Sequence, residues 1–151
     1  MVARLERDLF VEAPPERVFE LLAQPERTPE WSPNVVAIRR VGDGPIGVGS
    51  TTHALIKALG TQQRAIGRCT VFDPPRRIVI ESRTDLGARS RSDSQLVPEG
   101  SGTRLRATLE YVVPGGGLGQ LFDKLVAERQ TREDFEQALL RFKRLLEAGP
   151  A

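Results

Sequence analysis

The chain has 151 residues, of which 39% are apolar and 28% are charged, a size and balance that suit one soluble domain with its own core. Its formal net charge is +2, from 22 basic residues, nearly all of them arginine, against 20 acidic ones. The arginines are interleaved with the acids and no aromatic platform accompanies them, so we expect a solvated surface and no nucleic-acid partner.

Other classes are excluded by what the sequence lacks. No apolar run approaches the ~18 residues of a membrane helix, so no integral membrane segment is expected. One cysteine, Cys69, and one histidine, His53, cannot form an internal disulfide and are too few for a Cys/His zinc cage, so we expect no metal and no cofactor. The N-terminal residues alternate apolar and charged side chains where a secretory signal needs an unbroken apolar stretch, which predicts a cytoplasmic protein.

The N-terminal part predicts a strand followed by helical segments. Residues 3–12 alternate as a strand does, and Ala13-Pro14-Pro15-Glu16 then opens a helix, because proline and an acid both suit a first helical turn. Apolar residues continue at helical spacing to Leu22. The segment from Pro25 to Pro33 holds three prolines and Trp31, which predicts a short turn or broken helix.

The middle of the chain predicts an antiparallel meander. Glycine- and proline-rich turn signals separate short stretches of strand-like sequence, as tight hairpins require. The predicted strands are 34–41, 50–59, 62–72, 77–84, 88–97 and 103–113. Pro114-Gly115-Gly116-Gly117 then ends the sheet.

The last segment, residues 118–147, predicts one long helix. Its apolar residues recur in steps of three and four and define one buried stripe: Leu118, Leu121, Phe122, Leu125, Val126, Phe135, Ala138, Leu139, Phe142, Leu145 and Leu146. At 1.5 Å per residue the helix would be about 45 Å long, enough to cross a small sheet.

Charge identifies the inward face of each strand, because unpaired charges avoid a core. The inward positions are Thr52, Ala54, Ile56, Ala58, Ala65, Gly67, Cys69, Val71, Ile78, Ile80, Ser82, Ala88, Ser90, Ser92, Ser94, Leu96, Leu105, Ala107, Leu109, Tyr111 and Val113. Many of these residues are small, whereas a tightly packed two-layer core needs larger side chains. We therefore predict a cavity between the sheet and the long helix. The outward apolar residues are few: Leu55, Leu59, Ile66 and Phe72.

Several motifs then follow in a recognisable order and spacing. They are VEAPPERVFELL (11–22), PEWSP (29–33), VFDPPRRI (71–78) and GSGTRL (100–105), followed by the long C-terminal helix. This pattern resembles the START/Bet v 1-like (SRPBCC) superfamily, in its bacterial polyketide cyclase/dehydrase-like branch, over nearly the whole chain.

The resemblance implies an α+β helix-grip fold. In it a seven-stranded curved antiparallel sheet surrounds a long C-terminal helix, with two short helices after the first strand, in a single domain of residues 1–151. Members bind lipids, sterols, polyketides or other hydrophobic molecules, and some are aromatase/cyclases. The family has no universal catalytic triad, so the resemblance implies a cavity more directly than it implies an enzyme.

Two residues are the main candidates for polar contacts with a ligand. Arg7 has inward parity and can bind a carboxylate, enolate or phenolate through bidentate hydrogen bonds, unless it forms an internal ion pair or reaches the rim. Tyr111, the only tyrosine, can orient a ligand or act as a weak acid, unless it is a core residue bonded to a backbone carbonyl.

Weaker candidates have equally plain structural alternatives. Ser82, Ser90, Ser92 and Ser94 form an inward polar strip that binds ligand hydroxyls or merely makes room for the helix. His53 has outward parity, which indicates a surface histidine, and no G-x-S-x-G elbow supports a serine nucleophile. Trp31 is a lid or a packing residue, and the glycines of residues 115–119 indicate a hinge, since the Lys-Ser/Thr of a P-loop is absent.

Three functions remain open on the sequence alone. The first is binding of a hydrophobic or amphipathic small molecule by a monomer or homodimer. The second is a polyketide cyclase or dehydratase in the same cavity, and the third is a co-chaperone-like interaction module. The predicted cavity lining is Arg7, Trp31, Thr52, Ile56, Ile80, Ser82, Ser90, Ser92, Leu105, Leu109, Tyr111, Leu121, Phe122, Leu125 and Phe135.

Overall fold

Seven strands form one antiparallel sheet in the order β1-β7-β6-β5-β4-β3-β2. The computed structural model describes residues 3–58, 61–112 and 120–148, and the side chains of the last helix from Leu125 onward. The elements are β1 (Ala3–Val11), α1 (Pro15–Leu22), η1 (Pro25–Glu30), β2 (Val35–Arg40), β3 (Thr51–Ala58), β4 (Thr61–Asp73), β5 (Arg77–Thr84), β6 (Arg89–Glu99), β7 (Gly102–Val112) and α2 (Gln120–Glu147). The predicted strands and long helix are thus confirmed to within about two residues.

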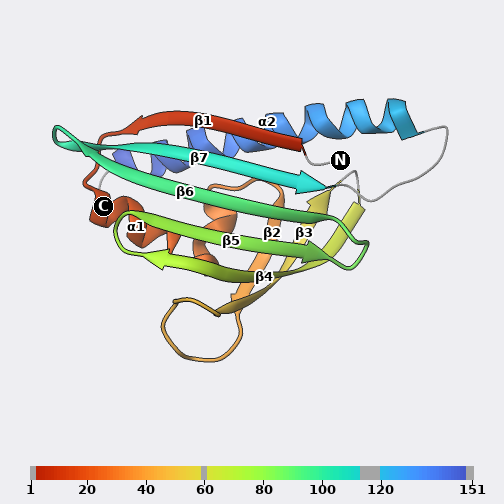
Figure 1. Cartoon of the computed structure of the whole chain (residues 1–151), viewed down its shortest axis with the longest axis horizontal. Coiled ribbons are helices and arrows are strands. Elements are labelled where there is room, and N and C mark those ends of the chain that lie inside the picture. Colours follow the sequence, from red (N-terminus) through yellow and green to blue (C-terminus); the bar gives the residue numbers. More distant parts are fainter. Residues whose placement is uncertain (1–2, 59–60, 113–119, 149–151) are drawn as a thin grey trace.

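All three helices lie on the same side of the sheet, which is its concave side (Figure 1). The helix α2 runs along β1, while α1 and η1 fill the space between the first strand and β2. A two-point ion pair helps to hold η1 against β2, with Arg40 donating to both carboxylate oxygens of Glu26. The arrangement is the helix-grip fold that the sequence predicts.

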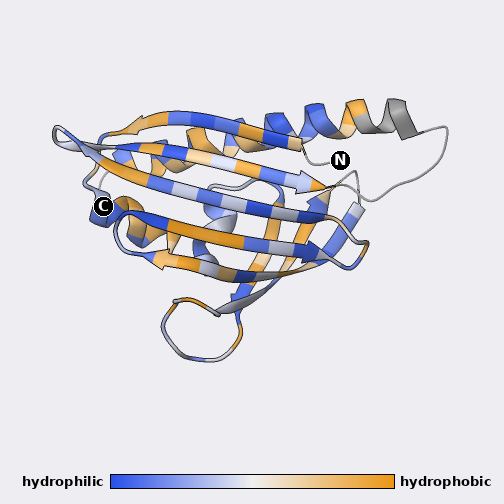
Figure 2. Cartoon of the chain, in the orientation of Figure 1, coloured by the Kyte–Doolittle hydropathy of each residue, from blue (hydrophilic) through white to orange (hydrophobic). Residues whose placement is uncertain are grey.

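Alternation of side chains separates a wet convex face from the concave face. In β7 the side chains of Arg104 and Arg106 are exposed, whereas Leu105 and Ala107, which alternate with them, are buried. The same alternation of hydrophilic and hydrophobic residues runs along the neighbouring strands (Figure 2). This pattern is typical of antiparallel sheets with one solvated face.

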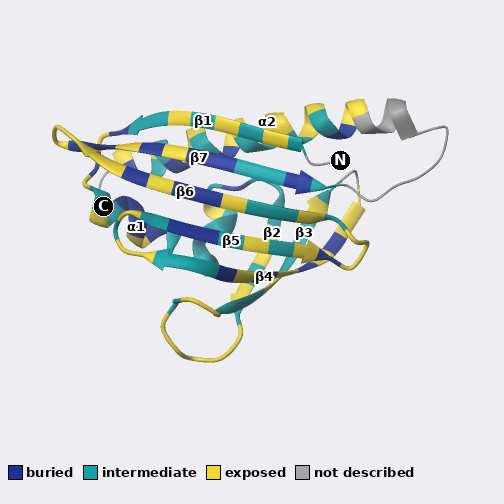
Figure 3. Ribbon diagram, viewed as in Figure 1, coloured by how far each residue is buried: buried dark blue, intermediate teal, exposed yellow. Residues whose placement is uncertain are grey.

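The hydrophobic core lies at one end of the molecule, which we call the packed end. There α1, the last turns of α2 and the adjoining ends of β1, β4, β5, β6 and β7 bring together buried side chains (Figure 3). These are Val11, Ala13, Val18, Phe19, Leu21, Cys69, Ile78, Leu96, Leu105, Phe142 and Leu146. The amphipathic α1 begins at a proline and buries Val18, Phe19 and Leu21, as its spacing predicts.

One part of the predicted facing is wrong, and an irregularity in β4 explains it. The register between β4 and β5 shifts between Cys69 and Val71, so β4 has one extra residue there. Side chains beyond this bulge therefore point to the opposite face from the one that alternation predicts. Phe72, predicted outward, therefore packs against the core, where its ring meets that of Phe19 edge to face at 5.3 Å. Val71, predicted inward, pairs instead with Val79.

Candidate functional site

A row of hydroxyl-bearing residues crosses the concave face, and we call it the hydroxyl row. It follows the direct cross-strand partners Thr52, Gly67, Ser82, Ser90 and Tyr111 on five consecutive strands, of which only Gly67 carries no hydroxyl. A Cβ atom on Gly67 would lie only 2.7 Å from the Thr52 hydroxyl and 3.3 Å from the Ser82 hydroxyl. Glycine is therefore needed for these two hydroxyls to flank the middle of the row.

An apolar row runs beside the hydroxyl row, one step closer to the packed end. It consists of Cys69, Ile80, Ser92, Leu109 and Leu5, which again are successive cross-strand partners. Ile80, Leu109 and Leu5 are only half-buried and Ser92 is exposed. Solvent therefore reaches this half of the concave face, which we call the open end.

Tyr111 ends the hydroxyl row close to α2. Its side chain is buried beside Thr131, with Glu128 and Arg132 of the same helix nearby. Burial, and then the negative charge of Glu128, raises the pKa of the Tyr111 phenol above its ordinary value. At neutral pH the phenol is therefore protonated and available as a hydrogen-bond donor.

Gln63 is a buried polar residue on the same face that the sequence analysis did not single out. Its Nε2 donates to the carbonyl oxygen of Ala58 at 3.2 Å and to the Thr61 hydroxyl at 3.3 Å. Its Oε1 is buried and has no donor among the described groups. Gln63 lies two residues before Ala65 and therefore on the same inward face of the strand. A polar amide at such a position needs hydrogen-bond partners, which could have identified it from the sequence.

Arg7 is engaged by the protein itself. Its guanidinium donates to the carboxylate of Glu136 on α2 at 2.6 Å and to the carbonyl oxygen of Glu6 at 2.8 Å. This is the internal ion pair that the sequence analysis kept as an alternative. Arg7 thereby joins the edge strand β1 to α2.

Two other predicted lining residues lie at the packed end. The Trp31 ring meets that of Phe142 edge to face at 5.0 Å, and its buried indole Nε1 has no acceptor among the described groups. Leu105 is 1% exposed and belongs to the core. The residues predicted to line the cavity are therefore divided between the packed end and the open end.

The remaining predicted residues are distributed as follows. Thr52, Ile56 and Phe135 are half-buried. The prediction that Leu125 and Val126 belong to the buried stripe of the last helix is wrong: they are 61% and 54% exposed, because Ala127, at 3% exposure, takes the buried position at this level of the helix. His53 is exposed on the convex face. The side chains of Leu121 and Phe122, together with Leu59, Val113 and the glycines of residues 115–119, lie outside the described residues.

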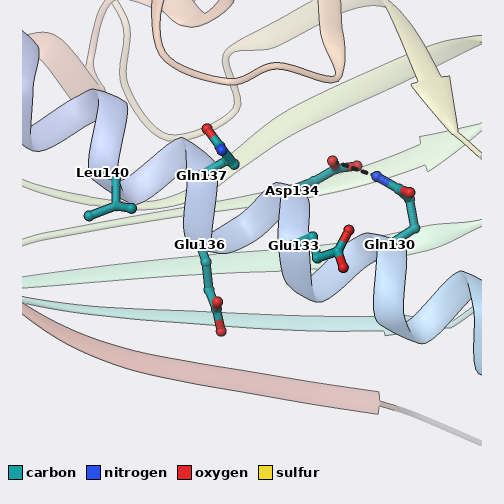
Figure 4. A pocket seen from close by; sticks show the side chains of 6 residues that line it. All are labelled: Gln130, Glu133, Asp134, Glu136, Gln137 and Leu140. Atoms are coloured by element: carbon teal, nitrogen blue, oxygen red, sulfur yellow. Dashed lines mark hydrogen bonds between the residues drawn. The ribbon is translucent and has the colours of Figure 1, made fainter.

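Two hollows in the described part of the chain are lined mostly by polar or charged residues. One of about 400 Å³ is lined on α2 by Gln130, Glu133, Asp134, Glu136, Gln137 and Leu140 (Figure 4). The other, of about 220 Å³, lies on the convex face and is lined by Asp8, Gln95, Val97, Arg104 and Arg106. Neither contains a residue predicted to line the cavity, and their charges do not suit an apolar ligand.

Figure 4 shows that side chains leave α2 in different directions. Glu136 points toward β1, where it meets Arg7, whereas Asp134 and Gln137 point to the other side of the helix. Among the described residues, no three His, Cys, Asp or Glu side chains gather as a metal site. No helix in the described ranges is long and apolar enough to span a membrane.

Comparisons with known proteins agree with this architecture. Solved structures similar to this chain include TTHA0849 from Thermus thermophilus, at 26% identity, a TM-score of 0.80 and coverage of 98% of this chain and 100% of that one. A START superfamily protein from Mycobacterium smegmatis matches at 21% identity and a TM-score of 0.72, covering 95% and 98%. The Zhui aromatase/cyclase from Streptomyces sp. R1128 matches at 18% identity and a TM-score of 0.73, covering both chains fully.

The family comparison covers almost the whole sequence. No curated protein matches the chain closely enough to count as a relative. The model of the family described as polyketide cyclase / dehydrase and lipid transport matches residues 2–147. The chain therefore belongs to that family.

Proposed function

We propose that the protein binds a hydrophobic or amphipathic small molecule against the open end of the concave face, beside α2. The observation that carries this proposal is the pairing of two adjacent rows, one of hydroxyls and one largely apolar, that stay partly accessible to solvent. Full burial of an exposed leucine or isoleucine side chain contributes about 1.5–3 kcal/mol, so a ligand that completes the burial of a half-buried one contributes about half of that.

The two rows favour a ligand with an apolar body and oxygen atoms along one edge. The neutral phenol of Tyr111 can donate to a ligand carbonyl or hydroxyl oxygen, and Thr52, Ser82 and Ser90 can donate or accept. The buried Oε1 of Gln63 can accept only, so it favours a ligand hydroxyl. Membership of a family described by polyketide chemistry and lipid transport is consistent with both lipid-like and polyketide-like ligands.

A cyclase or dehydratase acting on a polyketide-like substrate is the second candidate, and Tyr111 is the observation that favours it. A buried, protonated phenol can stabilise the oxygen of a developing enolate. Arg7 is held by Glu136 and is less suited to that role. If the protein is such an enzyme, Tyr111→Phe lowers turnover while ligand affinity changes little.

The binding proposal is tested first by native mass spectrometry of freshly purified protein, followed by denaturing extraction of any bound compound. In parallel, oleate displacement of 1-anilinonaphthalene-8-sulfonate measures affinity for an apolar probe. Ser90→Leu should weaken oleate binding at least tenfold, because the leucine occupies the space between Ser82 and Tyr111 in the hydroxyl row. Gln62→Leu, an exposed polar-to-leucine change on the convex face, is the matched control.

The result that contradicts the proposal is equally definite. A clean ligand-free mass, together with equal oleate affinity in the wild-type, Ser90→Leu and Gln62→Leu proteins, would show that the concave face does not hold the probe.

A further inference from the structure

One cross-strand row of the convex face carries a concentration of arginines. Arg39, His53, Ile66, Arg83 and Arg89 are successive partners on β2, β3, β4, β5 and β6. Arg64 and Arg68 flank Ile66 two residues away on β4, on the same face. We call the set of five arginines the arginine row, and all five are exposed.

The arginine row differs from the other arginines of the convex face in its partners. Toward the packed end, Arg77 pairs with Asp93, Arg104 with Glu99 and Arg106 with Asp8. Among the described residues, no member of the arginine row is within ion-pair distance of an acid. The acids closest to the row in register are Glu81, opposite Arg68, and Asp85, next to the β5 end. One half of the face is thus neutralised and the other carries an excess of positive charge.

Repulsion within the arginine row destabilises the sheet, and protection of the sheet edges does not explain why the row is there. Arg83 and Arg89 are direct cross-strand partners, and like charges placed opposite each other destabilise a sheet. Charged residues often protect edge strands from aggregation, but the edges here are β1 and β2. Because β5 and β6 are internal strands, edge protection does not account for this pair.

Exposed apolar side chains accompany the row at the same end of the molecule. Leu86, in the turn between Arg83 and Arg89, is 61% exposed. Leu125 and Val126, near the start of α2, are 61% and 54% exposed. The β5–β6 turn and the start of α2 both lie at the end opposite the packed end (Figure 1).

We propose that this end of the protein docks on an anionic lipid bilayer, with the arginine row against the headgroup phosphates and Leu86 inserted between them. Basic side chains flanking a protruding leucine fit the chemistry of a membrane interface. A nucleic acid would favour aromatic side chains for base stacking, and the cross-strand row of Arg39, His53, Ile66, Arg83 and Arg89 contains none beyond His53. Docking in this way places the open end of the concave face beside the membrane.

The test is co-sedimentation of the full chain with vesicles. We expect binding to vesicles of 70% phosphatidylcholine and 30% phosphatidylglycerol at low salt, loss of that binding at 0.5 M NaCl, and little binding to phosphatidylcholine alone. An arginine near an anionic surface contributes about 1 kcal/mol, so the double variant Arg83→Gln/Arg89→Gln should bind about 30-fold more weakly. Leu86→Ser should also weaken binding without changing the charge.

The matched control is Arg104→Gln/Arg106→Gln, which removes the same charge from the neutralised half of the same face. It should weaken binding no more than about threefold, because these arginines already have acid partners. Equal losses in the two double variants would show a general charge effect and overturn the proposal. If the Leu86→Ser variant binds vesicles as tightly as the wild type, and the protein binds a single-stranded RNA as tightly as it binds vesicles, the surface would instead be one for nucleic acid.

Failure of this proposal is distinguishable from failure of the ligand-binding proposal. None of the substituted residues lies on the concave face, so oleate affinity in detergent-free buffer should be unchanged in every vesicle-binding variant. Loss of vesicle binding with intact oleate binding supports two separate surfaces.

Discussion

Asp93 is the most enclosed carboxylate of the convex face and illustrates how single residues stabilise the sheet. Its side chain is 9% exposed and accepts two hydrogen bonds from Arg77, at 3.1 and 2.8 Å, while Arg91 lies at 3.7 Å. The hydrogen bonds from Arg77 are the main reason that the pKa of Asp93 lies below its ordinary value. Two neighbouring strands, β5 and β6, are joined by this contact.

Asp93→Asn should lower the free energy of unfolding by about 1–2 kcal/mol at neutral pH, since a charge-assisted pair is lost but Arg77 remains partly solvated. Because the folded-state pKa is lowered, the stabilisation is present above the ordinary aspartate pKa and is lost as the pH falls through the folded-state value. Urea unfolding between pH 2 and pH 7 should therefore show a smaller acid-dependent loss in the variant than in the wild type.

The control for this measurement is Asp73→Asn, which removes an exposed pair with Arg76 at 3.3 Å. Exposed pairs of this kind contribute less than about 1 kcal/mol. If Asp73→Asn lowers the free energy of unfolding as much as Asp93→Asn does, the Asp93–Arg77 pair contributes no more to stability than an exposed pair, and the prediction is wrong.

The residue scale is also where prediction from sequence is weakest. Parity along β1 predicts that Arg7 faces the concave side, but its partner Glu136 is 129 positions away and no local pattern links them. Tyr111 and the serines could be placed on one face from alternation alone. Their alignment in a single row depends on the register of five strands, which the sequence does not specify.

At the scale of elements, α2 has two unequal halves. Its C-terminal half buries Ala138, Phe142 and Leu146 against α1 and the sheet, whereas Leu125 and Val126 near its start are exposed. Ala127 beside them is 3% exposed, so this half of α2 also meets the rest of the protein, but through a small side chain. Among the described residues, the large buried side chains of α2 therefore lie only in its C-terminal half.

Phe142→Ala should destabilise the protein by about 3–5 kcal/mol, because it removes a 1%-exposed ring that packs against Trp31 and leaves a void. Leu140→Ala, on the same helix at 46% exposure, should change stability by less than about 1 kcal/mol. Urea unfolding monitored by the single tryptophan measures both. Similar losses in the two variants would mean that the helix does not pack as described.

Element types and boundaries followed from the sequence because turn residues and alternation are strong local signals. The seven strands, α1 and α2 are each encoded by a nearly continuous pattern. The facing of Phe72 was predicted wrongly because a bulge depends on the neighbouring strand as well as on its own residues. Ser92 has the predicted facing and is nevertheless exposed, because exposure depends on what covers the face.

At the scale of the whole molecule, the packed end and the open end should differ in local stability. Amides near Leu9, Leu96 and Leu105 lie beside the core and are expected to exchange hydrogen only on global unfolding. Amides of the edge strand β2 and its partner β3 should exchange through smaller openings, at rates at least tenfold faster. Native-state hydrogen exchange by mass spectrometry measures this, and uniform protection across the sheet would contradict it.

The distribution of charge over the molecule also emerges only at this scale. The sequence shows arginines interleaved with acids, which predicts a solvated surface but not where on it positive charge accumulates. In the sheet, strand register brings acids beside Arg104 and Arg106 but leaves Arg83 opposite Arg89. Composition therefore predicts the total charge but not which half of a face carries it.

The pairing of β1 with β7 has a consequence for the synthesis of the protein. Ala3 is the partner of Tyr111, so the first strand of the sheet must wait for the last strand of the sheet to be translated before its hydrogen bonds can form. At 5–20 residues per second, the intervening chain of about 100 residues takes roughly 5–20 s to translate. During that interval the meander from β2 to β6 can assemble hairpin by hairpin, while β1 and its leucines remain available to a nascent-chain chaperone.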